Sequence, residues 1–100
     1  MKILIIGGTG LISTPITRLL LERGDDVSLY NRGQRETRWA GQVTRLHGDR
    51  NDFAAFEAQM REAGPFDCVI DMVCFTPAQA ESAVRAFQGR TRQFIRRFPK

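Results

Sequence analysis

The residues of this 100-residue chain that could do chemistry begin with a glycine-rich turn, ILIIGGTGLIS, at residues 3–13. An apolar strand would lead into the turn, and Gly10 would let the backbone approach a pyrophosphate closely. The helix expected from Leu11 would aim its free N–H groups and its positive end at the same phosphates. Ser13 is small enough for that helix to lie near the strand. Because no Gly-Lys-Ser/Thr follows, a Walker-type site is excluded, and we interpret the turn as nucleotide-binding rather than purely structural.

A second group of polar residues follows about twenty residues later, where the next strand would end. An acidic residue at this place would bind the ribose 2′-hydroxyl of NAD, whereas an arginine suits the 2′-phosphate of NADP. The strand ends here in Tyr30-Asn31-Arg32. Asn31 carries no charge that would repel a phosphate, and Arg32 offers a planar, bidentate donor to which Arg35 could add a second charge. These residues favour NADP over NAD, with a solvent-exposed Arg32 as the alternative.

These candidate residues must be positioned by the elements around them. Short apolar runs predict strands over residues 2–7, 26–31, 41–49, 66–75 and 92–98. Helical spacing of apolar residues predicts helices over residues 11–23 and 52–63. The third of these strands alternates less cleanly than the others and is expected to be more exposed.

A third helix is expected after the fourth strand. Thr76, Pro77 and Gln79 have the spacing of a capping box with proline at the first helical position. Gly89 would end the helix, and its apolar stripe would consist of Ala80, Val84 and Phe87.

The order of the elements predicts an α/β fold with a doubly wound parallel sheet of the Rossmann type. Right-handed crossovers then give the strand order 3-2-1-4-5. Residues 1–100 would form one unit that stops after the fifth strand, without repeats or a linker.

Composition narrows the class of protein. The chain is 42% hydrophobic and 26% charged, which is typical of a globular domain. Its net charge of +4 and its arginine clusters at residues 31–38 and 90–97 are features that RNA-binding proteins share. Because no stacking aromatic platform accompanies the clusters, we interpret them as solvated surface. No apolar run approaches the roughly 18 residues of a membrane span, and the first residues are too short for a signal peptide, so we expect a cytoplasmic protein. Cys68 and Cys74 lack zinc spacing and are expected to be buried thiols outside any metal site.

Three short motifs carry a resemblance to a known family. GGTGLIS at residues 7–13, NRG at residues 31–33 and GDR at residues 48–50 resemble the extended or atypical short-chain dehydrogenases/reductases of the NAD-dependent epimerase/dehydratase type. The likeness extends over about the whole chain and corresponds to the N-terminal portion of the family. Ile6 and Ser13 stand where the family pattern has Thr and Gly.

The resemblance implies a role for individual residues toward an NADP or NAD cofactor. It places the pyrophosphate over the glycine turn, the adenosine ribose at the end of the second strand, the adenine after the third and the path to the nicotinamide after the fourth. The residues at the pyrophosphate are Gly7, Gly10, Leu11 and Ile12, and those at the adenosine ribose are Asn31 and Arg32. Asp49 and Arg50 would contact the adenine, and Met72 and Val73 would line the path to the nicotinamide. An equally weighted alternative makes Asp49 the N-cap of the helix beginning near residue 51 or 52. Asp71, inside an apolar strand, is expected to hydrogen-bond a neighbouring turn.

The resemblance also shows what is missing from these residues. Catalytic members of the family use a Tyr-x-x-x-Lys pair, in which the lysine lowers the pKa of the tyrosine. The single tyrosine, Tyr30, is followed four residues later by Gln34, and the lysines are Lys2 and Lys100. We therefore expect no catalytic residues and no turnover from these 100 residues.

Three interpretations of function follow. The leading one is the cofactor-binding N-terminal segment of an NADP-dependent reductase or epimerase/dehydratase-like protein. It takes the charged fifth strand, with Arg96 and Arg97, as a sign of truncation rather than of a protected edge. The alternative is a non-catalytic module that senses NADP and regulates a partner. RNA binding is the third, and self-association through the uncovered sheet edge is a further expectation.

Overall fold

The fold is an α/β sandwich built on one parallel sheet. The computed structural model describes residues 1–7, 13–31, 39 and 41–96. Within these residues the elements are β1 (Lys2–Ile6), α1 (Ser13–Glu22), β2 (Asp26–Asn31), β3 (Thr44–His47), α2 (Phe53–Ala63), β4 (Phe66–Asp71), α3 (Pro77–Phe87) and β5 (Thr91–Arg96). The strands pair in parallel in the order β3-β2-β1-β4-β5. The predicted doubly wound fold and strand order are confirmed.

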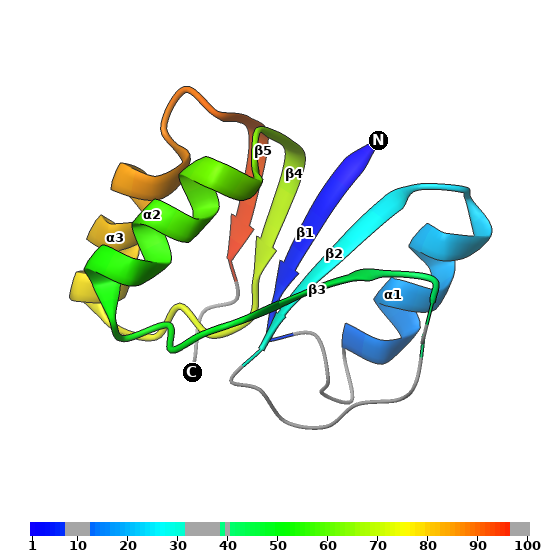
Figure 1. Cartoon of the computed structure of the whole chain (residues 1–100), viewed down its shortest axis with the longest axis horizontal. Coiled ribbons are helices and arrows are strands. Elements are labelled where there is room, and N and C mark those ends of the chain that lie inside the picture. Colours follow the sequence, from blue (N-terminus) through cyan, green and yellow to red (C-terminus); the bar gives the residue numbers. More distant parts are fainter. Residues whose placement is uncertain (8–12, 32–38, 40, 97–100) are drawn as a thin grey trace.

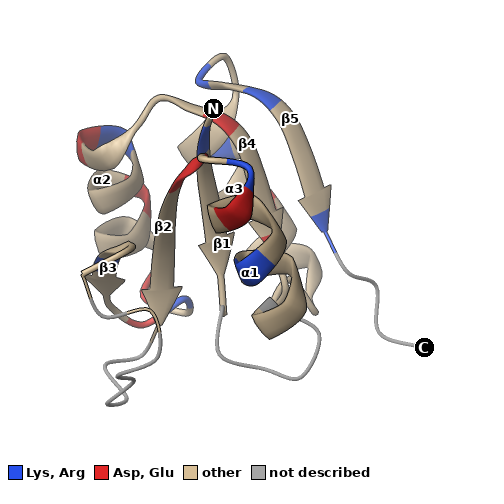
Figure 2. Ribbon diagram, turned by 90° about the vertical axis from the view of Figure 1, so that its right-hand side faces the viewer, with Lys and Arg blue, Asp and Glu red and all other residues tan. Residues whose placement is uncertain are grey.

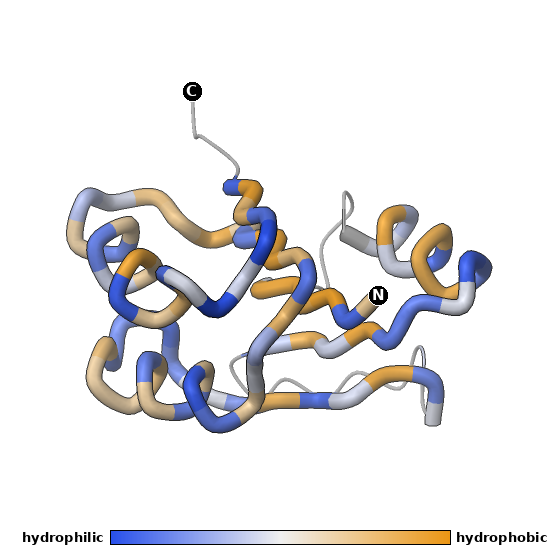
Figure 3. The backbone as a smooth tube through the Cα atoms, turned by 90° about the horizontal axis from the view of Figure 1, so that it is seen from above, coloured by the Kyte–Doolittle hydropathy of each residue, from blue (hydrophilic) through white to orange (hydrophobic). Residues whose placement is uncertain are grey.

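The helices cover the two faces of the sheet unequally. Helices α2 and α3 lie over one face and α1 lies over the other (Figure 1). Alternate residues of β1 serve the two faces, with Leu4 and Ile6 in the core under α2 and α3 and Ile3 and Ile5 in the core under α1. Figure 3 shows strongly hydrophobic residues along the strands at the centre of the molecule.

Three strands are shorter than the sequence predicts, β1 by the single residue Gly7. β4 ends at Asp71 instead of residue 75, because the Asp71 carboxylate accepts the Val73 N–H at 3.0 Å and turns the chain away from the sheet. β3 covers only Thr44–His47 of the predicted residues 41–49 and is partly exposed, as expected. The predicted start of the first helix, Leu11, lies outside the described residues.

The predicted capping box of α3 is confirmed. The Thr76 hydroxyl accepts the Gln79 N–H at 3.1 Å, and the Gln79 side chain accepts the Thr76 N–H at 3.1 Å. The predicted apolar stripe is wrong at Val84, whose side chain is exposed. α3 rests on α2 as well as on the sheet, so its buried face is displaced and includes small and polar residues: Gln79, Ser82, Ala83, Ala86 and Phe87.

β5 is an edge strand in the described part of the chain. It pairs with β4 on one side, and only Thr91 and Phe94 of its six residues are partly buried. Basic residues lie at both ends of β5 (Figure 2), and Arg92 and Arg96 are exposed. Among the helices described, none has the length and apolar character that crossing a membrane requires.

A buried carboxylate joins α2 to α3. Glu57 accepts hydrogen bonds from the Ser82 hydroxyl at 2.9 Å and from Arg85 Nε at 2.9 Å. These hydrogen bonds hold the pKa of Glu57 below its ordinary value, although burial opposes the shift, and the bond from Arg85 has the largest effect. The ionised form of Glu57 therefore stabilises the contact between the two helices.

The pH dependence of folding tests this contact. Because the pKa of Glu57 is lowered on folding, its stabilising contribution is present above the ordinary value of 4.5 and is lost as the pH falls through the folded value. We expect the free energy of unfolding of the wild type to exceed that of Glu57→Gln near neutral pH, with the difference shrinking in acid. Urea unfolding between neutral pH and pH values below 4.5 measures this difference. Glu62→Gln is the control, because Glu62 is an exposed residue on the same helix. A difference independent of pH would contradict the assignment.

Candidate functional site

The described residues of the predicted cofactor site gather at one edge of the sheet. Gly7 follows β1, Asn31 ends β2, Asp49 follows β3, and Met72 follows β4. The carboxyl ends of parallel strands share an edge, and here β1 lies between β2 and β4, where the chain switches from one half of the sheet to the other (Figure 1). Such a switch point is where α/β sheets bind ligands.

Gly7 is held tightly against the turn after β4. Its φ is +82°, a conformation that side-chain-bearing residues avoid, and its N–H donates to the Tyr30 carbonyl at 2.8 Å. A Cβ at this position would lie 2.9 Å from Val73 Cγ1 and 3.6 Å from Met72 Cβ. The first residue of the glycine turn thus contacts the residues predicted to lead toward the nicotinamide.

Several predicted cofactor contacts lie outside the described residues. These are Gly10, Leu11 and Ile12 of the glycine turn and Arg32 after β2. In the described residues α1 begins at Ser13, whereas the sequence predicts a start at Leu11.

The end of β2 is tied to the segment after β3. The Gly48 N–H donates to the Asn31 carbonyl at 3.0 Å. A Cβ on Gly48 would lie 2.5 Å from the Tyr30 hydroxyl oxygen and 3.1 Å from Gln59 Oε1, so only glycine lets this segment lie so close to β2. Sequence reasoning named the motif that contains Gly48 but gave the glycine no role, because the nearby hydroxyl comes from another strand.

Asp49 is exposed at the same edge. Its Oδ1 accepts the Asn51 N–H at 2.8 Å. The N-cap of α2 is Asp52, whose side chain accepts the Ala55 N–H at 3.4 Å. The alternative that Asp49 caps the helix is therefore wrong, because α2 begins one turn too late for it. The contact of Asp49 with adenine stays a prediction.

Arg50 is turned inward. The residue is 4% exposed, and its Nη2 donates to the Gln79 carbonyl at 2.6 Å. The same nitrogen lies 3.3 Å from Asp71 Oδ2, and the guanidinium carbon lies 4.1 Å from the centre of the Phe56 ring. The predicted contact of Arg50 with adenine is untested, but the groups that its guanidinium meets in this structure belong to the chain itself.

Asp71 performs the predicted structural role. It is fully buried at the end of β4, where Oδ1 accepts the Val73 N–H and Oδ2 faces Arg50. Burial raises the pKa of Asp71, and the nearby Arg50 guanidinium opposes that shift. The carboxylate thus connects the turn beside Gly7 to the segment after β3.

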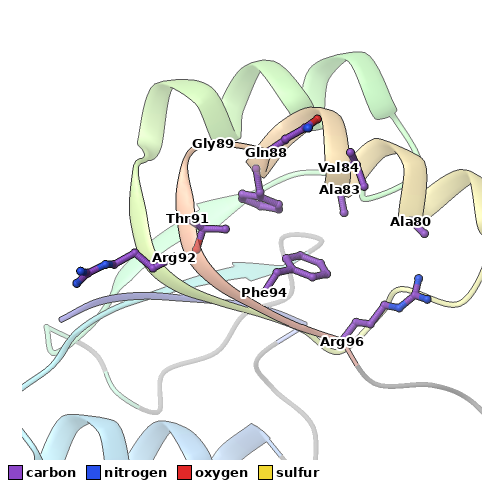
Figure 4. Close-up of a pocket in the computed structure, with 10 residues that line it drawn as sticks. Ala80, Ala83, Val84, Gln88, Gly89, Thr91, Arg92, Phe94 and Arg96 are labelled. Carbon is purple, nitrogen blue, oxygen red and sulfur yellow. The ribbon is translucent and has the colours of Figure 1, made fainter.

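A separate groove lies between α3 and β5 and reaches the carboxyl edge of the sheet only at Arg96. Its floor is apolar, with Phe87 and Phe94 among the lining side chains, and Arg92 and Arg96 lie toward its two ends (Figure 4). Of the predicted cofactor residues that the structure describes, none lines it. The two cysteines are buried free thiols, as predicted, and burial raises the pKa of Cys68.

Gly7→Ala tests the close contact with Val73. The change should cost about 1 kcal/mol for the left-handed conformation and a further ~1–3 kcal/mol for the overlap with Val73. Gly24 is the matched control, because its φ is +84° but nothing lies within 4 Å of an added Cβ. Urea unfolding should therefore show a larger loss for Gly7→Ala than for Gly24→Ala. Equal losses in the two variants would show that the contact with Val73 imposes no constraint.

Comparison with solved structures finds the same fold in other proteins. The anaerobillin reductase ChuY from Escherichia coli O157:H7 aligns over 96% of this chain and 50% of its own, at 22% identity and a TM-score of 0.73. The enzyme WbmH of Bordetella bronchiseptica, solved in complex with NAD+, aligns over 77% and 27%, at 27% identity and a TM-score of 0.58. The methyltransferase MycE of mycinamycin biosynthesis aligns over 90% and 26%, at 20% identity and a TM-score of 0.68.

This chain therefore spans about a quarter to a half of the length of these solved proteins. No significant match was found among curated proteins. The family described as the NAD dependent epimerase/dehydratase family matches residues 3–93, which is nearly the whole chain. The resemblance seen in the sequence is confirmed, and the chain belongs to the NAD dependent epimerase/dehydratase family.

Proposed function

We propose that this chain is a dinucleotide-binding segment of an oxidoreductase- or epimerase-like protein and that its cofactor is NADP. The observation that carries the proposal is Gly7, which lies in a left-handed conformation at the end of β1. Gly7 turns the chain out of β1 at the switch point, ahead of the start of α1, which is where sheets of this kind hold a pyrophosphate. Family membership and the NAD+-bound state of WbmH support the same cofactor class.

In this proposal the glycine turn, Asp49 and the turn after β4 each bind a different portion of the cofactor. The glycine turn, with Gly7, Gly10, Leu11 and Ile12, would hold the pyrophosphate against the first N–H groups of α1. Asp49, exposed at the edge, would accept a hydrogen bond from the adenine amino group. Met72 and Val73, both partly buried, would line the path to the nicotinamide. Once bound, the cofactor would supply hydride transfer, while these residues bind and orient it.

The preference for NADP rests on the residues after β2. Asn31 ends the strand without a carboxylate, and Arg32 follows it. A guanidinium at this place pairs with a 2′-phosphate in a bidentate, charge-assisted geometry that NAD does not offer. Arg32 thus serves as the residue that determines cofactor preference.

A second candidate function has an observation of its own. The 100 residues contain no Tyr-x-x-x-Lys pair, because the single tyrosine is followed four residues later by Gln34. Tyr30 itself is buried, and burial raises its pKa, which is opposite to what a catalytic tyrosine requires. This chain would then bind NADP without turning it over, as a sensing or regulatory module would.

Arg32→Ala tests the cofactor preference. In isothermal titration the wild type should bind NADP more tightly than NAD, and the variant should lose most of that preference, by about tenfold for the lost charge-assisted pair. The matched control is Arg90→Ala, which removes an exposed arginine far from this edge. An unchanged ratio of the two affinities in Arg32→Ala would exclude Arg32 as the determinant.

The absence of the catalytic pair gives a second test. We expect the 100-residue protein to bind NADPH and yet transfer no hydride to a panel of carbonyl substrates, with absorbance at the reduced nicotinamide band unchanged in stopped-flow mixing. A stoichiometric loss of that absorbance would show that other residues of this chain catalyse. Binding without transfer would fit both the cofactor-binding segment and the regulatory module.

A further inference from the structure

A buried polar network joins the segment after β3 to the turn after β4. The two strands are not neighbours, because β2 and β1 lie between them in the sheet. Arg50 spans the gap with one nitrogen, which donates to the Gln79 carbonyl at 2.6 Å and lies 3.3 Å from Asp71 Oδ2. The neighbouring Asn51 reinforces the link, since its Oδ1 accepts from Gln79 Nε2 at 2.8 Å.

The network ends at the glycine turn. Asp71 uses one oxygen for Arg50 and the other for the Val73 N–H, so the ion pair and the turn share one carboxylate. Val73 in turn presents its side chain to Gly7, at the distance that excludes a Cβ there. Gln79 fixes the next part of the same turn, because its Oε1 accepts the Phe75 N–H at 2.7 Å.

We propose that Arg50 is a positioning residue for the dinucleotide site: acting through Asp71, it holds the β4–α3 turn against Gly7 without itself touching the dinucleotide. This inference rests on the proposed function. It assigns Arg50 a different part from the adenine contact that the family resemblance implies.

The physical reason is the cost of an unpaired buried charge. Asp71 is fully buried and Arg50 nearly so, and the two form an ion pair. Arg96, opposite Asp71 on β5, is a second cation that lowers the pKa of Asp71, with a smaller effect than Arg50. Removing one partner leaves the other buried without its ion pair. The turn must then move to admit water, or, where Asp71 remains, its carboxylate must take up a proton. The guanidinium also lies over the Phe56 ring, with its carbon 4.1 Å from the ring centre, so Arg50→Lys keeps the positive charge but weakens this planar stacking.

The test combines Arg50→Lys, Asp71→Asn and the double variant, with Arg90→Lys as an exposed control. The first readouts need no cofactor. In NMR, Arg50→Lys should shift the Val73 and Gly7 amide resonances and raise the pKa of Asp71 followed through its carboxyl carbon, while the control leaves all three unchanged. Unchanged signals in Arg50→Lys would show that Arg50 does not act on the turn through Asp71, which would overturn the inference.

The second readout is the dissociation constant for NADP. Each single variant should weaken binding by about tenfold, and the double variant should bind no worse than Asp71→Asn, because both changes break one link. Losses that add in the double variant would show that Arg50 acts on the dinucleotide directly, and unchanged constants in both single variants would exclude any role. Either result overturns the inference.

Two further outcomes are distinguishable. If the wild type binds neither NADP nor NAD, the proposed function is wrong and the positioning role falls with it, whatever the NMR signals show. If Arg50→Lys does not fold, the wild type alone suffices, because protonation of Asp71 breaks the same ion pair. The NADP affinity should then fall with pH over the range in which the Asp71 carboxyl carbon titrates, and an affinity independent of that titration would refute the inference.

Discussion

The structure depends on β1 being buried on both faces. Four of its five residues, Ile3, Leu4, Ile5 and Ile6, are at most 2% exposed, and they alternate between the core under α1 and the core under α2 and α3. β1 also pairs with β2 on one side and β4 on the other, so both halves of the sheet are joined through β1. Its carboxyl end is therefore the most constrained point of the edge where the candidate site lies, and Gly7 lies there because no larger residue fits against Val73.

The fold was predictable because its signals are local. A continuous apolar run, a glycine turn and a capping box at Thr76 each report on residues adjacent in sequence, and the crossover rule then sets the strand order. The errors arose where tertiary contacts override local pattern. β4 ends early because Asp71 turns the chain, and Val84 is exposed because α3 shares its inner face with α2.

The candidate site was predictable only in part, for the same reason. Glycines and strand ends mark its position, but the partners of Gly48 and Arg50 come from other strands and helices and leave no pattern in sequence. What the structure adds is a buried polar network beneath the exposed residues of the edge. Asp49 is exposed and Arg50 is buried, although they are adjacent residues of one motif. We propose different parts for them, the first toward a ligand and the second toward the framework that supports it.

The most direct test of the central claim is an NMR titration of the 15N-labelled chain with NADP. The account predicts that the amide resonances of Gly7, Asn31, Asp49, Met72 and Val73 shift together and saturate, while those of Ala83 and Phe94 in the α3–β5 groove stay in place. Shifts confined to the groove, or none at about 1 mM NADP in a folded protein, would contradict a dinucleotide site at the carboxyl edge of the sheet.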